Sequence, residues 1–270
     1  MRCMPVILFV FLAMAAVPAG RASVTPDVAG YTGATIKQSG LTGTTVNASQ
    51  DGLLTSGLVG YWAFDGPDIA GTSVTDLSGQ GVSGTMTNGP DAAIGISGQA
   101  LSYDGTDDYT DFGDFQILAN GTVTFWARLN SLTGTPYLVS KVKSGANHGE
   151  WRLYVDSASS NKVTFTIESL APAVTTTITS DSGLSANQWY FIAVVWQSGV
   201  ASSQKMYIDG VVQASTASPG CGMEVTGVNL NIARNNALAN SYMTGRIDEL
   251  RIFSRALSSA EILLLYNTGH

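Results

Sequence analysis

The stretch Trp189-Tyr-Phe-Ile-Ala-Val-Val-Trp196 decides the fold class of this sequence. It has the length of one strand, and it consists mostly of aromatic and β-branched residues, which favour strands. Apolar side chains occupy both alternating sets of positions, so both faces of such a strand would need cover. The stretch therefore predicts a central strand that is buried on both sides of its sheet.

Strand patterns surround this central strand in the sequence. Alternating apolar side chains occur in three further runs, at residues 122–129, 151–155 and 162–167. Residues 204–208 lead into Asp209-Gly210, and an Asp-Gly pair between two apolar runs is a strong signal for a two-residue β-hairpin. Because Gly, Asn, Asp and Ser turns separate these runs, we predict an all-β fold, an antiparallel two-sheet β-sandwich.

One short C-terminal helix is expected beside the strands. Ser258-Ser-Ala-Glu261 is a capping box, in which the Ser258 hydroxyl accepts from the N–H of Glu261 and the Glu261 carboxylate accepts from that of Ser258. Leu257 and Ile262 occupy the flanking staple positions. The helix should run to about Tyr266 and dock on the sandwich through its apolar side chains, which are Ile262, Leu263, Leu265 and Tyr266.

The start of the chain has the build of a secretory signal. A basic residue, an apolar run at residues 6–17 and a region of small residues predict a signal peptide at residues 1–22. The run is shorter than the ~20 apolar residues that cross a bilayer, and an N-terminal anchor helix is the alternative. Residues 23–57 are rich in Thr, Gly and Ser and predict a linker or weakly ordered lead-in, with an extra strand as the alternative. We therefore expect a secreted, extracellular or cell-surface protein with one domain at residues 58–270.

The charge balance limits the classes of partner. Loss of a signal peptide would remove Arg2 and Arg21, so that 13 Lys and Arg residues fall to 11 against 20 Asp and Glu residues. Such an acidic chain without a basic run is a poor partner for nucleic acid or anionic lipid. Cys3 would be lost as well, so Cys221 would have no partner within the chain. Its thiol is then buried and inert, or it is free, or it is bonded to another chain. The domain must then be held by its core or by a metal.

Six segments resemble, in family order, the laminin-G-like jelly-roll domains of the concanavalin A-like lectin/glucanase superfamily. They are GLVGYWAFD (57–65), DLSG (76–79), ALSYDGTDDY (100–109), NQWYFIAVV (187–195), MYIDGV (206–211) and GRIDELRIFSRALSSAEI (245–262). Together these segments span nearly all of residues 58–266, and the resemblance implies a jelly roll. Fold does not give function, so the function has to be argued from particular residues.

The resemblance also implies a structural calcium ion (Ca2+) at the sandwich edge, with Asp65, Asp76 and Asp248 as its ligands. Calcium takes six to eight oxygen ligands, and here it would clamp the first strand to the last. The turn after Gly79 lacks the Asn and Asp residues that are common in the family, which weakens any ligand drawn from it. The alternative is that Asp65 and Asp76 are turn residues and that Asp248 is a hydrogen-bond or salt-bridge partner. A second acidic cluster is either a solvated loop or a second calcium site, and consists of Asp104, Asp107, Asp108 and Asp111.

The sequence does not support an enzyme. The Glu-x-Asp-x-Glu strand of the family 16 glycoside hydrolases is absent, and Glu249, next to Asp248, is expected on the opposite face of its strand. A serine-hydrolase elbow and the glycine signatures of nucleotide-binding folds are absent too. A divergent glycoside hydrolase is the remaining catalytic alternative.

Aromatic faces beside amide and carboxylate groups are the expected means of binding a sugar. The candidate ligand-binding residues are Tyr109, Trp151, Tyr242 and Asn235, with Asn147, His148 and Asn236 as further loop candidates. Alternatively, Trp151 faces the core and Asn235 belongs to a turn. We expect a non-catalytic module that binds a polysaccharide or glycoconjugate, and the alternative is an adhesion or surface-assembly domain that binds protein.

Overall fold

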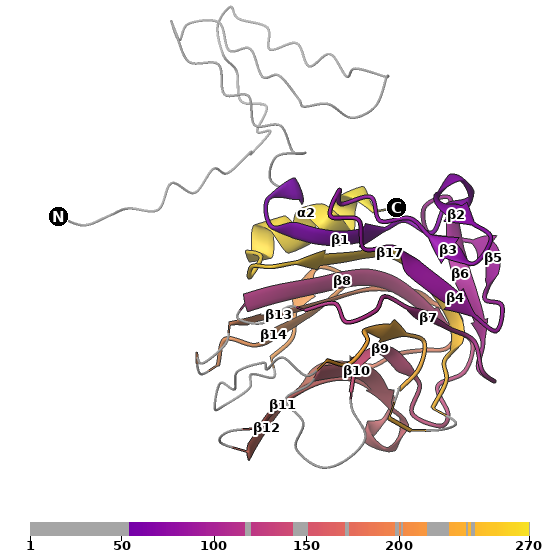
Figure 1. Ribbon diagram of the computed structural model, residues 1–270. Coiled ribbons are helices and arrows are strands. Elements are labelled where there is room, and N and C mark those ends of the chain that lie inside the picture. Colours follow the sequence, from indigo (N-terminus) through magenta and orange to yellow (C-terminus); the bar gives the residue numbers. More distant parts are fainter. Residues whose placement is uncertain are drawn as a thin grey trace, which may run out of the picture. The chain divides into compact units, whose positions relative to one another are not determined.

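The computed structural model in Figure 1 describes residues 54–116, 120–142, 151–170, 173–197, 200, 202–214, 227–235, 237–238 and 241–269. The predicted signal peptide, most of the predicted lead-in and Cys221 lie outside these residues. The described part forms two antiparallel sheets and one C-terminal helix, which confirms the predicted all-β sandwich.

The two sheets are called sheet A and sheet B. Sheet A consists of β1 (Leu58–Trp62), β5 (Asp91–Ile94), β6 (Gln99–Asp104), β8 (Asn120–Leu129), β13 (Trp189–Gln197), β14 (Lys205–Ile208), β15 (Val211–Val212) and β17 (Thr244–Phe253). Sheet B consists of β2 (Ile69–Ala70), β3 (Ser73–Val74), β4 (Gly84–Thr87), β7 (Tyr109–Asp111), β9 (Tyr137–Lys141), β10 (Trp151–Asp156), β11 (Lys162–Leu170), β12 (Ala173–Gly183) and β16 (Asn231–Ile232). The helical segments are the 3-10 turns η1 (Gly66–Asp68) and η2 (Ser157–Ser159) and the helix α2 (Ser259–Thr268).

Strand order follows a crossed-over, antiparallel topology. Sheet A runs β15-β14-β13-β8-β17-β6-β5, with β1 paired to β17, and sheet B runs β12-β11-β10-β9-β16-β7-β4-β3-β2. Between β14 and β15, Asp209 and Gly210 both have positive φ values, of 51° and 76°. A type I′ turn requires this conformation at both positions, so the predicted Asp-Gly hairpin is confirmed.

One large hydrophobic core fills the space between the inner faces of the two sheets. β13 contributes to this core and also to a second, smaller core on the outer face of sheet A. The side chains that face the main core are Ile192, Val194 and Trp196, and those that face the smaller one are Phe191, Ala193 and Val195. The prediction of a central strand buried on both sides is confirmed.

The helix α2 covers the outer face of sheet A (Figure 1). Its capping box is confirmed, because Ser258 Oγ accepts from the Glu261 N–H at 3.3 Å and the Ser258 N–H donates to Glu261 Oε2 at 2.8 Å. The Tyr266 ring stacks on Trp126 with 5.6 Å between centroids. The predicted docking of Leu263 is wrong, since its side chain is 47% exposed. Within the described residues, no helix has the length and apolar character needed to cross a membrane.

A β-bulge interrupts β17 at the two neighbouring carboxylates. Glu249 has a φ of 55°, and the pairing with β8 shifts register between Asp248 and Arg251. Ile247 and Leu250 both face the main core, so the two residues between them both point away from it. The prediction that Asp248 and Glu249 lie on opposite faces is therefore wrong.

Candidate functional site

Two loops at one end of the sandwich bring polar and aromatic side chains together. One loop joins β6 to β7 at residues 105–108, and the other lies between β16 and β17 at residues 233–243. They lie side by side, because Thr244 pairs with Asp104 and its Oγ1 donates to the Asp104 carbonyl at 3.2 Å. This surface is called the loop end.

Tyr109 is directed outward at the loop end by the strand that carries it. The next residue, Thr110, is fully buried and its hydroxyl bonds the Tyr103 hydroxyl at 3.0 Å inside the core. Since side chains alternate along a strand, Tyr109 points to the outer face of sheet B, where it is partly exposed.

Arg234 lies directly over the ring of Tyr109. Its Cζ atom is 3.4 Å from the ring centroid, and its Nε atom donates to Asn231 Oδ1 at 2.7 Å. These two contacts hold the guanidinium group in one orientation. Its terminal nitrogens have no partner among the described residues, so they are available as hydrogen-bond donors.

Tyr242 shares this surface with Arg234. The two residues form an isolated antiparallel bridge, and directly opposed residues of such a pair project their side chains to the same side. Both side chains are partly exposed. The loop end thus presents two tyrosines and one oriented arginine.

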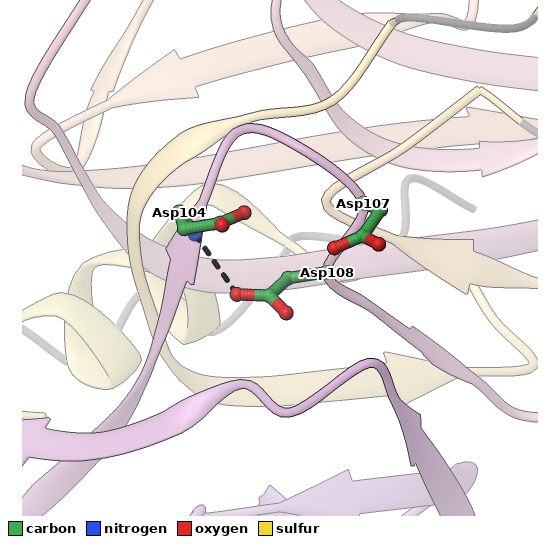
Figure 2. A group of neighbouring side chains, drawn as sticks. All are labelled: Asp104, Asp107 and Asp108. Atoms are coloured by element: carbon green, nitrogen blue, oxygen red, sulfur yellow. Dashed lines mark hydrogen bonds between the residues drawn. The ribbon is translucent and has the colours of Figure 1, made fainter.

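Three carboxylates gather on the loop between β6 and β7 (Figure 2). The ligand oxygens of Asp104, Asp107 and Asp108 all lie within 4.8 Å of one another. Asp104 and Asp107 are exposed, whereas Asp108 is 6% exposed and accepts the Asp104 N–H at 3.0 Å. The fourth predicted member, Asp111, is separate, since it accepts from the Gly113 N–H and from Asn229.

The carboxylates of this loop differ in their proton affinity. The backbone N–H of Thr106 holds the pKa of Asp104 below its usual value. Burial raises the pKa of Asp108, and the charges of Asp104 and Asp107 raise it further. Asp104 is therefore the carboxylate that these contacts favour in its charged form, whereas burial disfavours the charged form of Asp108.

A glycine shapes this acidic loop. Gly105 has a φ of 81°, and a Cβ atom there would lie 1.9 Å from Thr244 Oγ1. Both the backbone conformation and the close approach of the second loop exclude a side chain at this position. The two loops are thus packed against each other with no spare room.

The predicted sugar-binding residues divide into two groups. Tyr109 and Tyr242 both lie at the loop end, where Arg234 covers the ring of Tyr109 and pairs with Tyr242 through the backbone. Trp151 is 2% exposed and packs in the main core at 6.0 Å from Trp196, so its assignment to ligand contact is wrong. Asn235 is 4% exposed, and its Oδ1 accepts from the Ala237 N–H, which makes it a turn residue. The further loop candidates Asn147, His148 and Asn236 lie outside the described residues.

Asp76 organises the turn that follows β3. Its Oδ1 accepts from the N–H groups of Tyr61 and Ser78, and its Oδ2 accepts from the Ser78 hydroxyl and the Val82 N–H. Burial acts to raise its pKa, but these hydrogen bonds prevail and hold the pKa below its usual value. The geometry matches the turn interpretation.

Asp65 and Asp248 hold the turn at residues 95–99 from two sides. Asp65 Oδ1 accepts the Gln99 N–H at 2.7 Å, and Asp248 Oδ2 accepts those of Ile96 at 2.8 Å and Ser97 at 3.2 Å. Asp248 is fully buried, and its Oδ1 has no hydrogen-bond partner. Burial raises the pKa of Asp248 to about 7, and the neighbouring charge of Glu249 acts in the same direction.

These three carboxylates do not fit the edge calcium that the family resemblance implies. A calcium site needs six to eight oxygens directed at one point. Here the positive ends of N–H groups face Asp65, Asp76 and Asp248 instead, and they lie where a cation would approach. Of the three residues, Asp248 alone offers a buried oxygen without a partner. The clamp between the first and last strands is made by hydrogen bonds.

Each glutamate that the structure describes is held in an ion pair with an arginine. Glu168 pairs with Arg152 at 2.5 Å, Glu249 pairs with Arg251, and Glu261 pairs with Arg255 at 2.6 Å. Glu249 also accepts from the Tyr61 hydroxyl at 3.1 Å. A glutamate committed in this way is poorly placed to act as an acid or nucleophile.

Comparison with known proteins agrees with the architecture. The profile of a family described as the concanavalin A-like lectin/glucanases superfamily matches residues 104–263. No curated protein sequence matches the chain.

Several solved structures share the fold. The binding domain of Paraclostridial mosquitocidal protein 1 aligns with a TM-score of 0.63 and 16% identity over 80% of this chain and 53% of that one. Domain 4 of AbnA, a GH43 extracellular arabinanase from Geobacillus stearothermophilus solved with arabinotriose, aligns with a TM-score of 0.57 and 18% identity over 77% and 98%. The botulinum neurotoxin serotype D ligand-binding domain, solved with N-acetylneuraminic acid, aligns with a TM-score of 0.59 and 14% identity over 81% and 52%. The chain thus spans about half the length of the toxin domains, and at these identities the likeness shows the fold alone.

Proposed function

Because this chain belongs to the concanavalin A-like lectin/glucanases superfamily, we propose that it is a non-catalytic binding module that recognises a neutral carbohydrate at the loop end. The observation that carries the proposal is the guanidinium group of Arg234, which is oriented by Tyr109 and Asn231 and keeps its terminal nitrogens available. Orientation before binding lowers the entropy that a ligand must overcome.

The loop end has the donors and acceptors that sugar hydroxyls require. A hydroxyl group both donates and accepts, and vicinal hydroxyls suit a forked donor such as arginine. Arg234 supplies donors, and the exposed carboxylates of Asp104 and Asp107 supply acceptors. Charged partners make these hydrogen bonds stronger than neutral ones. Arabinotriose and N-acetylneuraminic acid, bound to the two related folds above, lend general support to a sugar ligand.

The charge of the surface favours a neutral sugar over an acidic one. Three carboxylates gather on one of the two loops, and the whole chain carries a net charge of −7. An anionic ligand would be repelled on approach and again on binding.

The absence of catalysis is supported by the state of the glutamates. The described ones are paired with arginines, and Glu249 also accepts from the Tyr61 hydroxyl at a bulge. We also propose that the protein acts outside the cell after loss of residues 1–22, on the basis of the signal-like start of the sequence. N-terminal sequencing of protein recovered from the culture medium tests that proposal, which fails if the chain still begins at Met1.

A glycan array tests the proposed ligand class. We expect the full chain to bind neutral oligosaccharides and to give weaker signals on sialylated or uronate-containing glycans of the same length. Arg234→Ala should remove the neutral signals. Binding confined to acidic glycans would overturn the proposed specificity, and an array without any signal would overturn the proposed function.

A further inference from the structure

A cavity of about 500 Å³ lies on the outer side of sheet A, beside the start of α2. Val195 of β13 and Tyr207 of β14 form its sheet side, and Leu257 and Ser259 form the side toward the helix. The volume is within the range of small-ligand pockets. The cavity shares no residue with the loop end, and neither the fold nor the proposed carbohydrate site uses it.

The described lining residues of the cavity carry one positive charge and no carboxylate. Lys205 is the one charged residue among its described lining residues, and its side chain is exposed. The nearby carboxylate of Glu261 is neutralised by Arg255 at 2.6 Å and is occupied by the N–H of Ser258. The net charge of the chain is −7, whereas the described lining of this cavity has a cation and no carboxylate.

The other lining residues can contact both the C–H face and the hydroxyl groups of a sugar ring. Val200, which is 49% exposed, and the partly exposed Ala256 offer apolar contact for a face that carries only C–H groups. The Tyr207 hydroxyl and Ser259 Oγ are 3.0 Å apart, and either can donate to the other. Such a pair can present a donor or an acceptor to a ligand hydroxyl without leaving a buried group unpaired.

We propose that this cavity binds a monosaccharide unit that carries a carboxylate, such as a uronic acid. The carboxylate pairs with the Lys205 ammonium group, the ring lies against Val200 and Ala256, and a ring hydroxyl joins the pair of Tyr207 and Ser259. The protein would then have two sites of opposite preference, one for neutral sugar at the loop end and one for acidic sugar beside α2. This second site does not depend on the first.

A titration of the full chain with glucuronate, followed by amide NMR shifts, tests the proposal, with glucose as the neutral ligand of the same ring size. We expect glucuronate to give saturable shifts at Val195, Tyr207 and Ser259, and glucose to give none there. Because the carboxylate would lose its charged partner, Lys205→Gln should weaken glucuronate binding about tenfold. Lys205 is exposed, so this variant is expected to keep its fold.

Two control variants separate this site from other causes. Lys162→Gln removes a lysine of sheet B, and Arg234→Ala alters the loop end; glucuronate binding should be unchanged in both. Absence of saturable shifts up to ~10 mM, tenfold above a 1 mM dissociation constant, would overturn the proposal. So would equal shifts with glucose, or an unchanged affinity in Lys205→Gln. Loss of glucuronate binding in Arg234→Ala would instead show that glucuronate binds at the loop end. That result would contradict both the neutral preference of the loop end and the acidic preference of the cavity.

Discussion

Replacing Asp248 by Asn should remove a large part of the pH dependence of stability. Asp248 is fully buried in β17, where Oδ2 accepts two backbone N–H groups and Oδ1 has no partner. Burial raises its pKa from 3.8 to about 7 in the folded protein. The unfolded chain has no such burial, so its carboxyl should titrate near the ordinary value.

The direction in which stability changes with pH follows from proton binding. Between pH 3.8 and about 7 the folded protein holds a proton on Asp248 that the unfolded chain has released. Stability from this group therefore falls as the pH rises through that window, and the loss is complete above the folded pKa. A shift of about three pH units corresponds to about 4 kcal/mol, at 1.36 kcal/mol for each unit.

Urea unfolding of the full chain at several pH values between 4 and 8 measures this loss. In Asp248→Asn the side chain stays uncharged, and its Oδ1 can still accept from Ile96 and Ser97. Between pH 4 and 8 this variant should therefore lose about 4 kcal/mol less unfolding free energy than wild type. Asp91→Asn, at an exposed carboxylate, is the matched control. The reasoning is refuted if wild type and Asp248→Asn lose the same stability between pH 4 and 8.

Three further predictions concern the metal, a loop glycine and the helix cap. Because N–H groups face the edge carboxylates, we expect the same melting temperature in calcium and in chelator, and a rise with calcium that disappears in Asp248→Ala would contradict this. Gly105→Ala should strain a left-handed backbone and collide with Thr244, which lowers stability by about 1–3 kcal/mol in urea unfolding and weakens sugar binding; unchanged values in both assays would argue against tight packing of the two loops. Ser258→Ala should cost about 1 kcal/mol, since the Glu261 N–H loses its acceptor, whereas Ser258→Thr should restore most of it; equal stability of all three proteins would count against the cap.

The parts of the fold that depend on short stretches of sequence were predictable. The continuous apolar run at residues 189–196, the Asp209-Gly210 turn and the pair Ser258 and Glu261 each act within a few residues, and each is present in the structure. The bulge at Glu249 is not predictable from the sequence, because its contacts are with the distant Tyr61 hydroxyl and with β8. The pattern of apolar residues along the strand does not indicate the bulge.

The candidate site was predictable only in part, for the same reason. Tyr109 and Tyr242 were recognised as loop aromatics, but Trp151 has the same local character and lies in the core. Arg234 was missed entirely, because the ring that orients it is far away in the sequence and only the pairing of β7 with β16 brings them together. A basic residue in a loop of a single sequence gives no signal of such a contact.

The most direct test of the loop-end site is the affinity of the full chain for a neutral oligosaccharide, measured by calorimetry in wild type, Arg234→Ala and Arg246→Ala. Arg246 lies on β17 of sheet A and serves as the matched control. Loss of charge-assisted hydrogen bonds should weaken binding at least tenfold in Arg234→Ala and leave Arg246→Ala like wild type. Equal affinities in wild type and Arg234→Ala, with both proteins folded, would contradict the account.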